Sequence, residues 1–471
     1  MIKSTIIYGI ASLLPAMLGF FLLPFFSKTL TTSEFGIIAA MGVLNTVISA
    51  FSDLSLTRAA FRFYFDFTDD AGRKKVLGTF FIGSNAVAIF FFAILILLKP
   101  LLLMAYPQID FYPYYFLTIV TVTVSVCGNY VLNYLRIAEK PALYFLMMLL
   151  TVSMQGGLVY YFVFLEKENA LGQIHALLYL SLILFPVYLT LAYKNFAVVF
   201  DWALFKEGLA YSWPAIPSLL IAWILNWSNS IFLAHYGTMS EVGMYAMAYK
   251  ISTIFLLATS AFSVAYQPVF FRKANEENQV AAKQSLFSII QVASRGFIVC
   301  GFLLALFSED IVRLLLDEKY KDISLIIRII LLSHILPAIM GISSNLYYQQ
   351  SKRIKFQLAV VGLSAAINIL LNYLLIPKFG MYGAAFATVI SMVVMTAMSY
   401  AYSKSCYFIN IYWWKLSIMI GASAIMVLFF QEFIEGYWFS LPLKIVFLLM
   451  LTALLFVNKG ARNLFREFSS Q

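Results

Sequence analysis

Apolar residues fill long blocks of the chain, and short polar stretches separate the blocks. A helix that spans a bilayer needs about 20 mainly apolar residues, and fourteen segments meet this requirement. They cover residues 5–27, 36–61, 76–98, 114–135, 142–164, 171–193, 208–234, 243–268, 285–307, 324–347, 356–376, 380–402, 413–431 and 440–457. The pattern predicts an all-α membrane protein with these fourteen transmembrane helices. The first segment is too long for the apolar region of a signal peptide, so we expect it to be a retained membrane helix.

Composition excludes a soluble fold. Of the 471 residues, 62% are apolar and only 11% are charged, whereas soluble domains are roughly 25% charged. The net charge of +10 indicates basic cytoplasmic loops rather than a nucleic-acid partner. Cys127, Cys300 and Cys406 show neither metal spacing nor a pairing pattern. We therefore expect no cofactor and no metal site.

The distribution of Lys and Arg predicts the orientation in the membrane. With the N-terminus in the cytoplasm, twenty of these residues fall on the cytoplasmic side, eight fall outside and four lie within helices. This asymmetry favours cytoplasmic termini at both ends and an even number of helices. The longest outer loop, residues 308–324, has an apolar stripe, so we expect it to lie on the membrane surface.

Two short motifs recur in the two halves of the chain. The first is Gly-x-Ala-x-x-x-Pro-Ala, at Gly9–Ala16 and again at Gly208–Ala215. The second is "SEFG" at Ser33–Gly36 and "SEVG" at Ser240–Gly243. Six predicted helices separate the copies, and an even number keeps both halves in the same orientation. The chain therefore predicts a parallel repeat, which is a transporter architecture.

The repeat predicts two six-helix lobes around a central cavity. The first lobe takes residues 1–200 (helices 1–6), and the second takes residues 201–405 (helices 7–12). Residues 406–471 supply two extra helices and a cytoplasmic tail.

Four stretches of the sequence resemble a known family. They are "LTTSEFGIIAA", "GTMSEVGMYAMAYKI", "LRIAEKPALYF" and "LLIPKFGMYGAAFATVIS". In this order they resemble the oligosaccharide flippases, the O-antigen and capsule-repeat translocases of the multidrug/oligosaccharidyl-lipid/polysaccharide exporter superfamily. The resemblance covers about residues 1–405. The chain departs from it in helix 7, where Asn229-Ser230 stands in place of an Asp-Arg pair that many members carry, so no role of that pair is carried over.

Ionisable residues within predicted helices are candidates for function, because a charge in the hydrocarbon region is costly. They are Asp53, Arg58, Lys250, Arg295 and Arg328. Arg295 lies near the middle of its helix and Lys250 about two turns from the outer surface, which favours a role in substrate binding. Arg58 and Arg328 lie near helix ends, so snorkelling to the headgroups is an equal alternative.

Two polar helix faces complete the candidate substrate site. Asn45, Ser49 and Asp53 recur every four residues. Asn226 and Asn229 share a face of the seventh helix beside Trp223. The resemblance implies that helices 1, 2, 7 and 8 line the cavity, where amides and aromatic rings suit sugar hydroxyls. Interhelical hydrogen bonds are an equally good explanation of both faces.

The resemblance implies a flippase that moves a polyprenyl-pyrophosphate-linked oligosaccharide repeat unit to the outer face of a bacterial cell membrane by alternating access. Its partners would be this substrate, membrane lipids and glycan polymerase components of the same pathway. A peptidoglycan-precursor flippase remains open. A drug or cation antiporter is disfavoured, because the helices offer one carboxylate against four cations. The chain lacks a P-loop, which excludes direct use of ATP. Short outer loops argue against an enzyme such as a glycan polymerase or ligase.

Overall fold

The computed structural model describes residues 2–213, 216–433 and 442, and within this part every regular element is a helix. The all-α prediction is therefore confirmed. Apart from residue 442, the predicted helix 440–457 and the tail lie outside the described residues. Contacts divide the chain into two compact units, Met1–Ala246 and Met247–Gln471.

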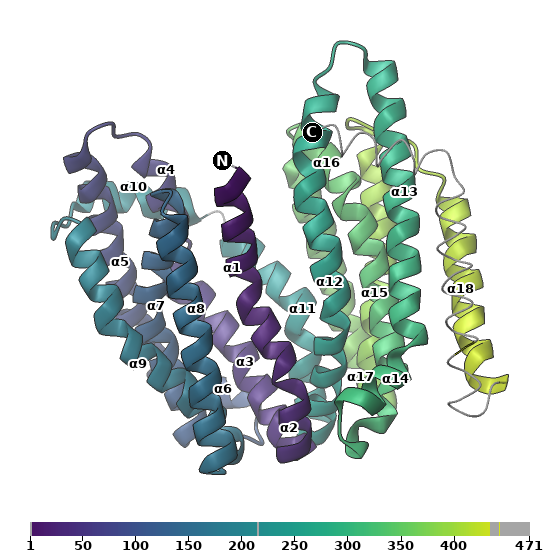
Figure 1. Cartoon of the computed structure of the whole chain (residues 1–471), viewed down its shortest axis with the longest axis horizontal. Coiled ribbons are helices and arrows are strands. Elements are labelled where there is room, and N and C mark those ends of the chain that lie inside the picture. Colours follow the sequence, from purple (N-terminus) through teal and green to yellow (C-terminus); the bar gives the residue numbers. More distant parts are fainter. Residues whose placement is uncertain (1, 214–215, 434–441, 443–471) are drawn as a thin grey trace. The chain divides into compact units, whose positions relative to one another are not determined.

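The first unit is a bundle of helices built around α7 (Figure 1). Its elements are α1 (Ile2–Phe21), α2 (Leu23–Thr29), α3 (Thr32–Asp53), α4 (Leu56–Tyr64), α5 (Asp70–Leu97), α6 (Lys99–Ala105), η1 (Phe111–Tyr115), α7 (Phe116–Ile137), α8 (Pro141–Val159), η2 (Tyr160–Leu165), α9 (Asn169–Asn195), α10 (Trp202–Ser212) and α11 (Ile216–Tyr236). Helix α7 packs against α3, α5 and α9, and α1 packs against α8.

Buried tyrosines stabilise the core of the first unit. Their rings pack against apolar side chains, and their hydroxyl groups form hydrogen bonds. Tyr130 is fully buried and donates a hydrogen bond to the carbonyl oxygen of Leu77 (3.0 Å). Tyr134 donates to Asn195 Oδ1 (2.8 Å). These bonds satisfy hydroxyl groups that would otherwise be costly to bury.

The link from α9 to α10 is fastened to α5 by an ion pair. Lys75 Nζ lies 2.6 Å from Asp201 Oδ2, and Asp201 Oδ1 accepts from the N–H of Leu204 at the start of α10 (3.1 Å). The hydrogen bonds from Lys75 and from the backbone lower the pKa of Asp201 below its usual value. Asp201 therefore caps α10 in its charged form.

The second unit contains the remaining long helices. They are α12 (Met239–Ala274, which begins in the first unit), α13 (Gln279–Leu306), α14 (Ser308–Leu315), η4 (Glu318–Ile323), α15 (Ser324–Gly341), α16 (Ser344–Gln350), α17 (Ile354–Ser403) and α18 (Trp413–Phe433). Helix α15 packs against α13 and α17, and α18 lies beside α13 (Figure 1).

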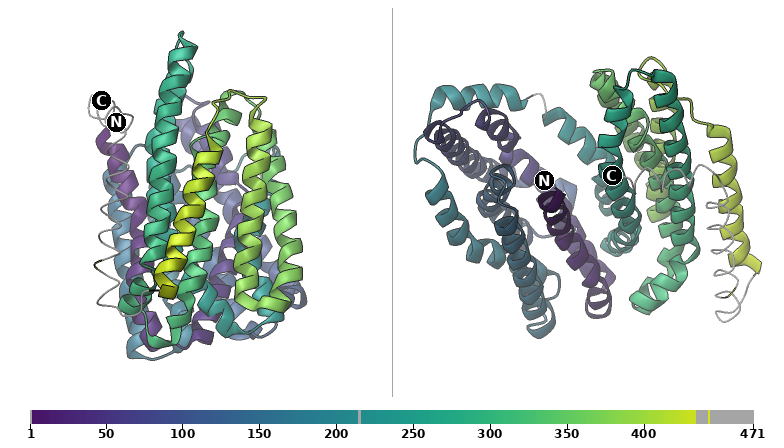
Figure 2. Two further views of the ribbon diagram at one scale, coloured as in Figure 1. Left: turned by 90° about the vertical axis from the view of Figure 1, so that its right-hand side faces the viewer. Right: turned by 45° about the horizontal axis from the view of Figure 1, so that its top comes forward.

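Helix α17 contains a sharp turn at Gly380, whose φ of 52° suits a residue without a side chain. The two halves run side by side (Figure 2). A Cβ at Gly383 would lie 2.5 Å from the carbonyl oxygen of Leu375, and Ala384 and Ala385 are fully buried. Small residues therefore let the second half approach the first. The separate segments predicted at 356–376 and 380–402 are the two halves of this helix.

Ten helices of the described part are long and apolar enough to cross a membrane, by length and composition. The chain is thus a multi-pass membrane protein. The total of fourteen crossings stays a prediction. The ten helices do not include α11 or α18, and all of them lie within the described residues.

Two predicted helices were wrong as continuous elements. The segment 36–61 is two helices, because Leu54 and Ser55 adopt left-handed backbone angles (φ 45° and 58°) between α3 and α4. Asp53 accepts hydrogen bonds from the N–H (3.3 Å) and the hydroxyl (2.5 Å) of Thr57. These local bonds stabilise the first turn of α4. The segment 324–347 is also divided, since α15 ends at Gly341 and α16 begins at Ser344 after a non-helical Ser343. The predicted helix 208–234 includes residues 214–215, which lie outside the described residues, so its continuity stays a prediction.

Candidate functional site

The predicted polar face of the second segment is split by the break after α3. Asn45 and Asp53 are half-buried on α3, but Arg58 belongs to α4 and its side chain is exposed. Placing Arg58 on the same helix as Asn45 and Asp53 was therefore wrong. Asp53 is satisfied by Thr57 rather than by an ion pair with Arg58. Asp53 thus has a local structural role as a helix-starting residue.

The polar face of α11 makes hydrogen bonds within the first unit. Asn229 is 3% exposed and donates to the hydroxyl of Tyr245 (2.8 Å). Tyr106 donates to Ser230 Oγ (3.1 Å), and burial raises the pKa of Tyr106, so its hydroxyl keeps its proton. Interhelical hydrogen bonding therefore accounts for much of this face.

The neighbouring candidates on α11 differ from Asn229. The indole nitrogen of Trp223 is buried and has no hydrogen-bond partner within the described part of the chain. The side chain of Asn226 lies outside the described residues. Sequence reasoning missed Tyr106 and Tyr245 because nothing in their local pattern distinguishes them among 29 tyrosines.

Arg295 is the cation whose position fits a binding role best. It lies in the middle of α13 and is half-buried. Across residues 2–213, 216–433 and 442, no side chain forms an ion pair or hydrogen bond with it. An uncompensated guanidinium in an apolar helix is costly and is a functional candidate by default. Lys250, on α12, has an exposed side chain.

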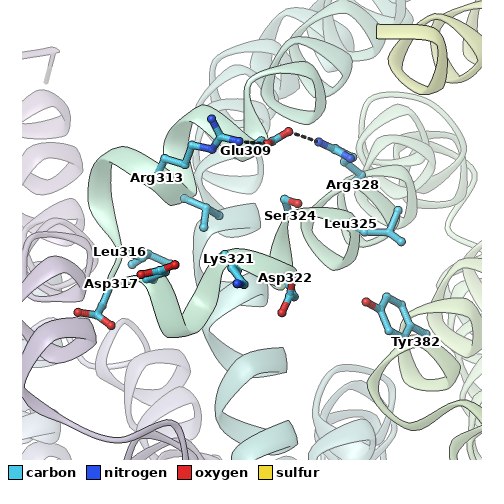
Figure 3. A pocket seen from close by; sticks show the side chains of 12 residues that line it. Glu309, Arg313, Leu316, Asp317, Lys321, Asp322, Ser324, Leu325, Arg328 and Tyr382 are labelled. Atoms are coloured by element: carbon cyan, nitrogen blue, oxygen red, sulfur yellow. Dashed lines mark hydrogen bonds and ion pairs between the residues drawn. The ribbon is translucent and has the colours of Figure 1, made fainter. Parts of the chain in front are cut away.

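Arg328 is different, because neighbouring groups of the second unit hold it. It is 9% exposed, and its Nε donates to Ser308 Oγ (2.8 Å) and to the carbonyl oxygen of Ala305 (3.3 Å). Its Nη2 lies 3.8 Å from Glu309 Oε2 (Figure 3). Arg328 therefore belongs to the junction of α13, α14 and α15.

Each copy of the second repeated motif supplies the Glu of a reciprocal hydrogen-bonded pair at the start of a helix. Thr31 and Glu34 exchange hydrogen bonds in a capping box at the start of α3 (2.7 and 3.2 Å). Thr238 and Glu241 make the same reciprocal pair at the start of α12 (3.0 and 3.2 Å). Each copy thus satisfies orphan N–H groups at a helix N-terminus.

The glycines of the two motifs lie at the point where these helix starts meet. A Cβ at Gly243 would lie 2.8 Å from the amide nitrogen of Gly36 and would collide with the carbonyl oxygen of Thr32. The hydroxyls of Thr32 and Ser240 are hydrogen-bonded at 2.8 Å. The sequence shows that the motif recurs, but only the structure shows that its two copies pack together.

Comparisons with known proteins agree with this architecture. A family described as "Polysaccharide biosynthesis protein" matches residues 26–325. The Haloferax volcanii protein "Probable low-salt glycan biosynthesis flippase Agl15" is 24% identical over 41% of this chain and 41% of its own length. "Probable flippase AglR" of the same organism is 26% identical over 36% of this chain and 35% of its own. The chain thus matches less than half the length of these relatives.

Solved structures with a similar fold are membrane transporters. The inward closed conformation of the lipid II flippase MurJ superposes with a TM-score of 0.75 at 15% identity, covering 98% of this chain and 100% of MurJ. An inward-facing multidrug resistance MATE transporter gives a TM-score of 0.64 at 15% identity, and the match covers 87% of this chain and 95% of the transporter's chain. At such identities the likeness shows the fold alone. The family match covers more than half of the residues of this chain, so the chain belongs to the polysaccharide biosynthesis protein family.

Proposed function

We propose that the chain is a flippase that carries a polyprenyl-pyrophosphate-linked oligosaccharide repeat unit across the cell membrane, with both of its own termini in the cytoplasm. The observation that carries the proposal is the family match over residues 26–325. Relatives named as glycan biosynthesis flippases and the shared MurJ fold support a transporter of lipid-linked sugars rather than an enzyme.

The charges of the helices favour an anionic head group. A pyrophosphate brings about two negative charges, and transferring it into a low-dielectric cavity without partners is costly. Arg295 lies in mid-helix without an ion pair in the described part of the chain, so it can offset this cost. The guanidinium grips a phosphate with two parallel hydrogen bonds, whereas a Lys acts as a point charge. Lys250, Asn45, Asn226 and Trp223 are the other proposed contacts.

Lipid II is the second candidate substrate, because it also carries a pyrophosphate and the MurJ fold extends over 98% of this chain. Charge alone does not separate the two substrates, since both present the same linkage to Arg295. The sugars make the difference, so the test must compare head groups. A cationic drug is disfavoured, because Asp53 is occupied by Thr57.

The role of Arg295 is tested by complementation in a strain that lacks the gene. Arg295→Ala should abolish surface glycan at unchanged protein level, with lipid-linked repeat units accumulating in the cytoplasmic leaflet. Arg295→Lys should restore only part of the glycan, because charge returns without the two-pronged geometry. The exposed Lys194→Ala is the matched control and should behave as wild type. Full glycan display by Arg295→Ala would remove this residue from the mechanism.

A further inference from the structure

A polar pocket lies in the second unit, and Arg295 is not among its lining residues. Figure 3 shows the side chains that line it. Its volume is about 760 Å³, and α14, η4, the start of α15 and the residue Tyr382 of α17 form its walls. The lining is rich in charge of both signs. The cations are Arg313, Lys321 and Arg328, and the carboxylates are Glu309, Asp317, Glu318 and Asp322.

The guanidinium of Arg328 in this pocket lacks a full set of acceptors. Its Nε bonds only to neutral oxygens, and the carboxylate of Glu309 lies 3.8 Å from Nη2 while its other oxygen binds Arg313 at 2.6 Å. Arg328 Nη1 is buried and has no hydrogen-bond partner within the described part of the chain. Buried donors are nearly always paired, and a guanidinium has five N–H groups to satisfy. The arrangement therefore points to an anionic ligand as a further acceptor for this guanidinium.

The carboxylates restrict what that anion can be. Asp322 is exposed and lines the pocket, and Asp317 on the same wall is paired with Lys319, whose Nζ lies 3.9 Å from its Oδ1. A simple anion would meet repulsion at Asp322. A molecule with a phosphate at one end and an ammonium at the other matches both sets of charges. The phosphate would reach Arg328 and the ammonium would reach Asp322.

Apolar side chains beside the pocket indicate that the ligand carries hydrocarbon. Leu325 lines the pocket and is 41% exposed, and Leu314, next to the lining residue Arg313 in the sequence, is 84% exposed. Helix α14 has Glu309 and Arg313 on one face and Asp310 and Leu314 on a neighbouring face, while Val312 is buried. A short helix of this kind lies in the membrane interface, where headgroups and acyl chains meet.

We propose that this pocket binds the headgroup of a zwitterionic phospholipid, with its phosphate on Arg328 and its ammonium on Asp322. The acyl chains lie over Leu314 and Leu325. The site is separate from the proposed translocation site, so the bound lipid is a structural ligand rather than the transported substrate.

Native mass spectrometry of the full purified chain tests the proposal. The protein is incubated with equal amounts of phosphatidylethanolamine, phosphatidylcholine and phosphatidylglycerol, and retained lipid is measured for each. Wild type should retain phosphatidylethanolamine best. Arg328→Gln should retain it about tenfold less, as expected for the loss of a charge-assisted hydrogen bond. The exposed Lys28→Gln, outside the pocket, is the matched control.

A second variant covers the case in which Arg328→Gln does not fold. Asp322→Asn removes an exposed ammonium partner and should abolish the preference for phosphatidylethanolamine over phosphatidylglycerol. Equal retention of all three lipids by wild type, or a wild-type pattern in Asp322→Asn, would overturn the proposal. A preference for phosphatidylglycerol would overturn the zwitterionic assignment. Equal retention of free phosphoethanolamine would overturn the assignment to a lipid.

Discussion

Replacing Gly243 by Ala tests whether the contact between the two repeated motifs stabilises the first unit. The new Cβ would lie 2.8 Å from the amide nitrogen of Gly36, although ordinary contacts begin at 3.4 Å. It would also collide with the carbonyl oxygen of Thr32. Both obstacles are backbone atoms, so no side-chain rotation relieves them. The start of α12 must therefore move away from α3 by more than the roughly 0.6 Å that the Gly36 contact alone requires, because the carbonyl oxygen of Thr32 is closer still.

Overpacking of this kind costs about 1–3 kcal/mol, and we expect the upper part of that range because backbone must shift. The Thr32–Ser240 hydrogen bond of 2.8 Å would lengthen at the same time. The assay is the midpoint of thermal unfolding of the full chain in detergent, followed by size-exclusion chromatography of heated samples. Gly243→Ala should lower the midpoint by several degrees.

Gly42→Ala is the matched control, because this glycine also lies on α3 but a Cβ added to it would have no neighbouring atom within 4 Å. Ala is a better helix former than Gly by about 1 kcal/mol, so this variant should be as stable as wild type or more so. If Gly243→Ala unfolds at the same temperature as Gly42→Ala, the close contact of the two motifs does not stabilise the protein and the reasoning is refuted.

Two further predictions concern topology and helix capping. Reporter fusions after Lys167, Gly237 and Lys378 should all be outside the cell, because the charge asymmetry puts both termini in the cytoplasm; a cytoplasmic signal at Gly237 would contradict the parallel repeat. Thr238→Ala removes one half of the capping box of α12 and should cost about 1 kcal/mol of stability. The same thermal assay measures it, and an unchanged midpoint would show that solvent replaces the cap.

The sequence predicted most of the helices because apolar length alone specifies a membrane span. It failed at the break after α3, where neither Gly nor Pro marks the turn. Leu54 and Ser55 adopt left-handed angles there, and Thr57 binds Asp53. By contrast, the turn in α17 was predictable, since Pro377 and Gly380 interrupt the apolar run.

The candidate site was less predictable than the fold. The sequence places Arg295 near the middle of its helix and Arg328 near a helix end, but it does not show what holds Arg328. Ser308 and Glu309, some twenty residues away in sequence, contact Arg328 near the start of α15. Asn229 was predicted as a substrate contact for its polar character but is buried against Tyr245. The partners of Arg328 and Asn229 are distant in the sequence, so a local sequence pattern does not predict them.

Reconstitution of the purified full chain in liposomes tests the central claim most directly. Three substrates are compared: a fluorescent polyprenyl-pyrophosphate oligosaccharide, lipid II and an organic cation, each loaded in one leaflet or compartment. We predict that the wild-type chain moves the oligosaccharide lipid between leaflets faster than lipid II, that it does not move the cation, and that Arg295→Ala abolishes the movement. Transport of the cation with no movement of either lipid would contradict the account.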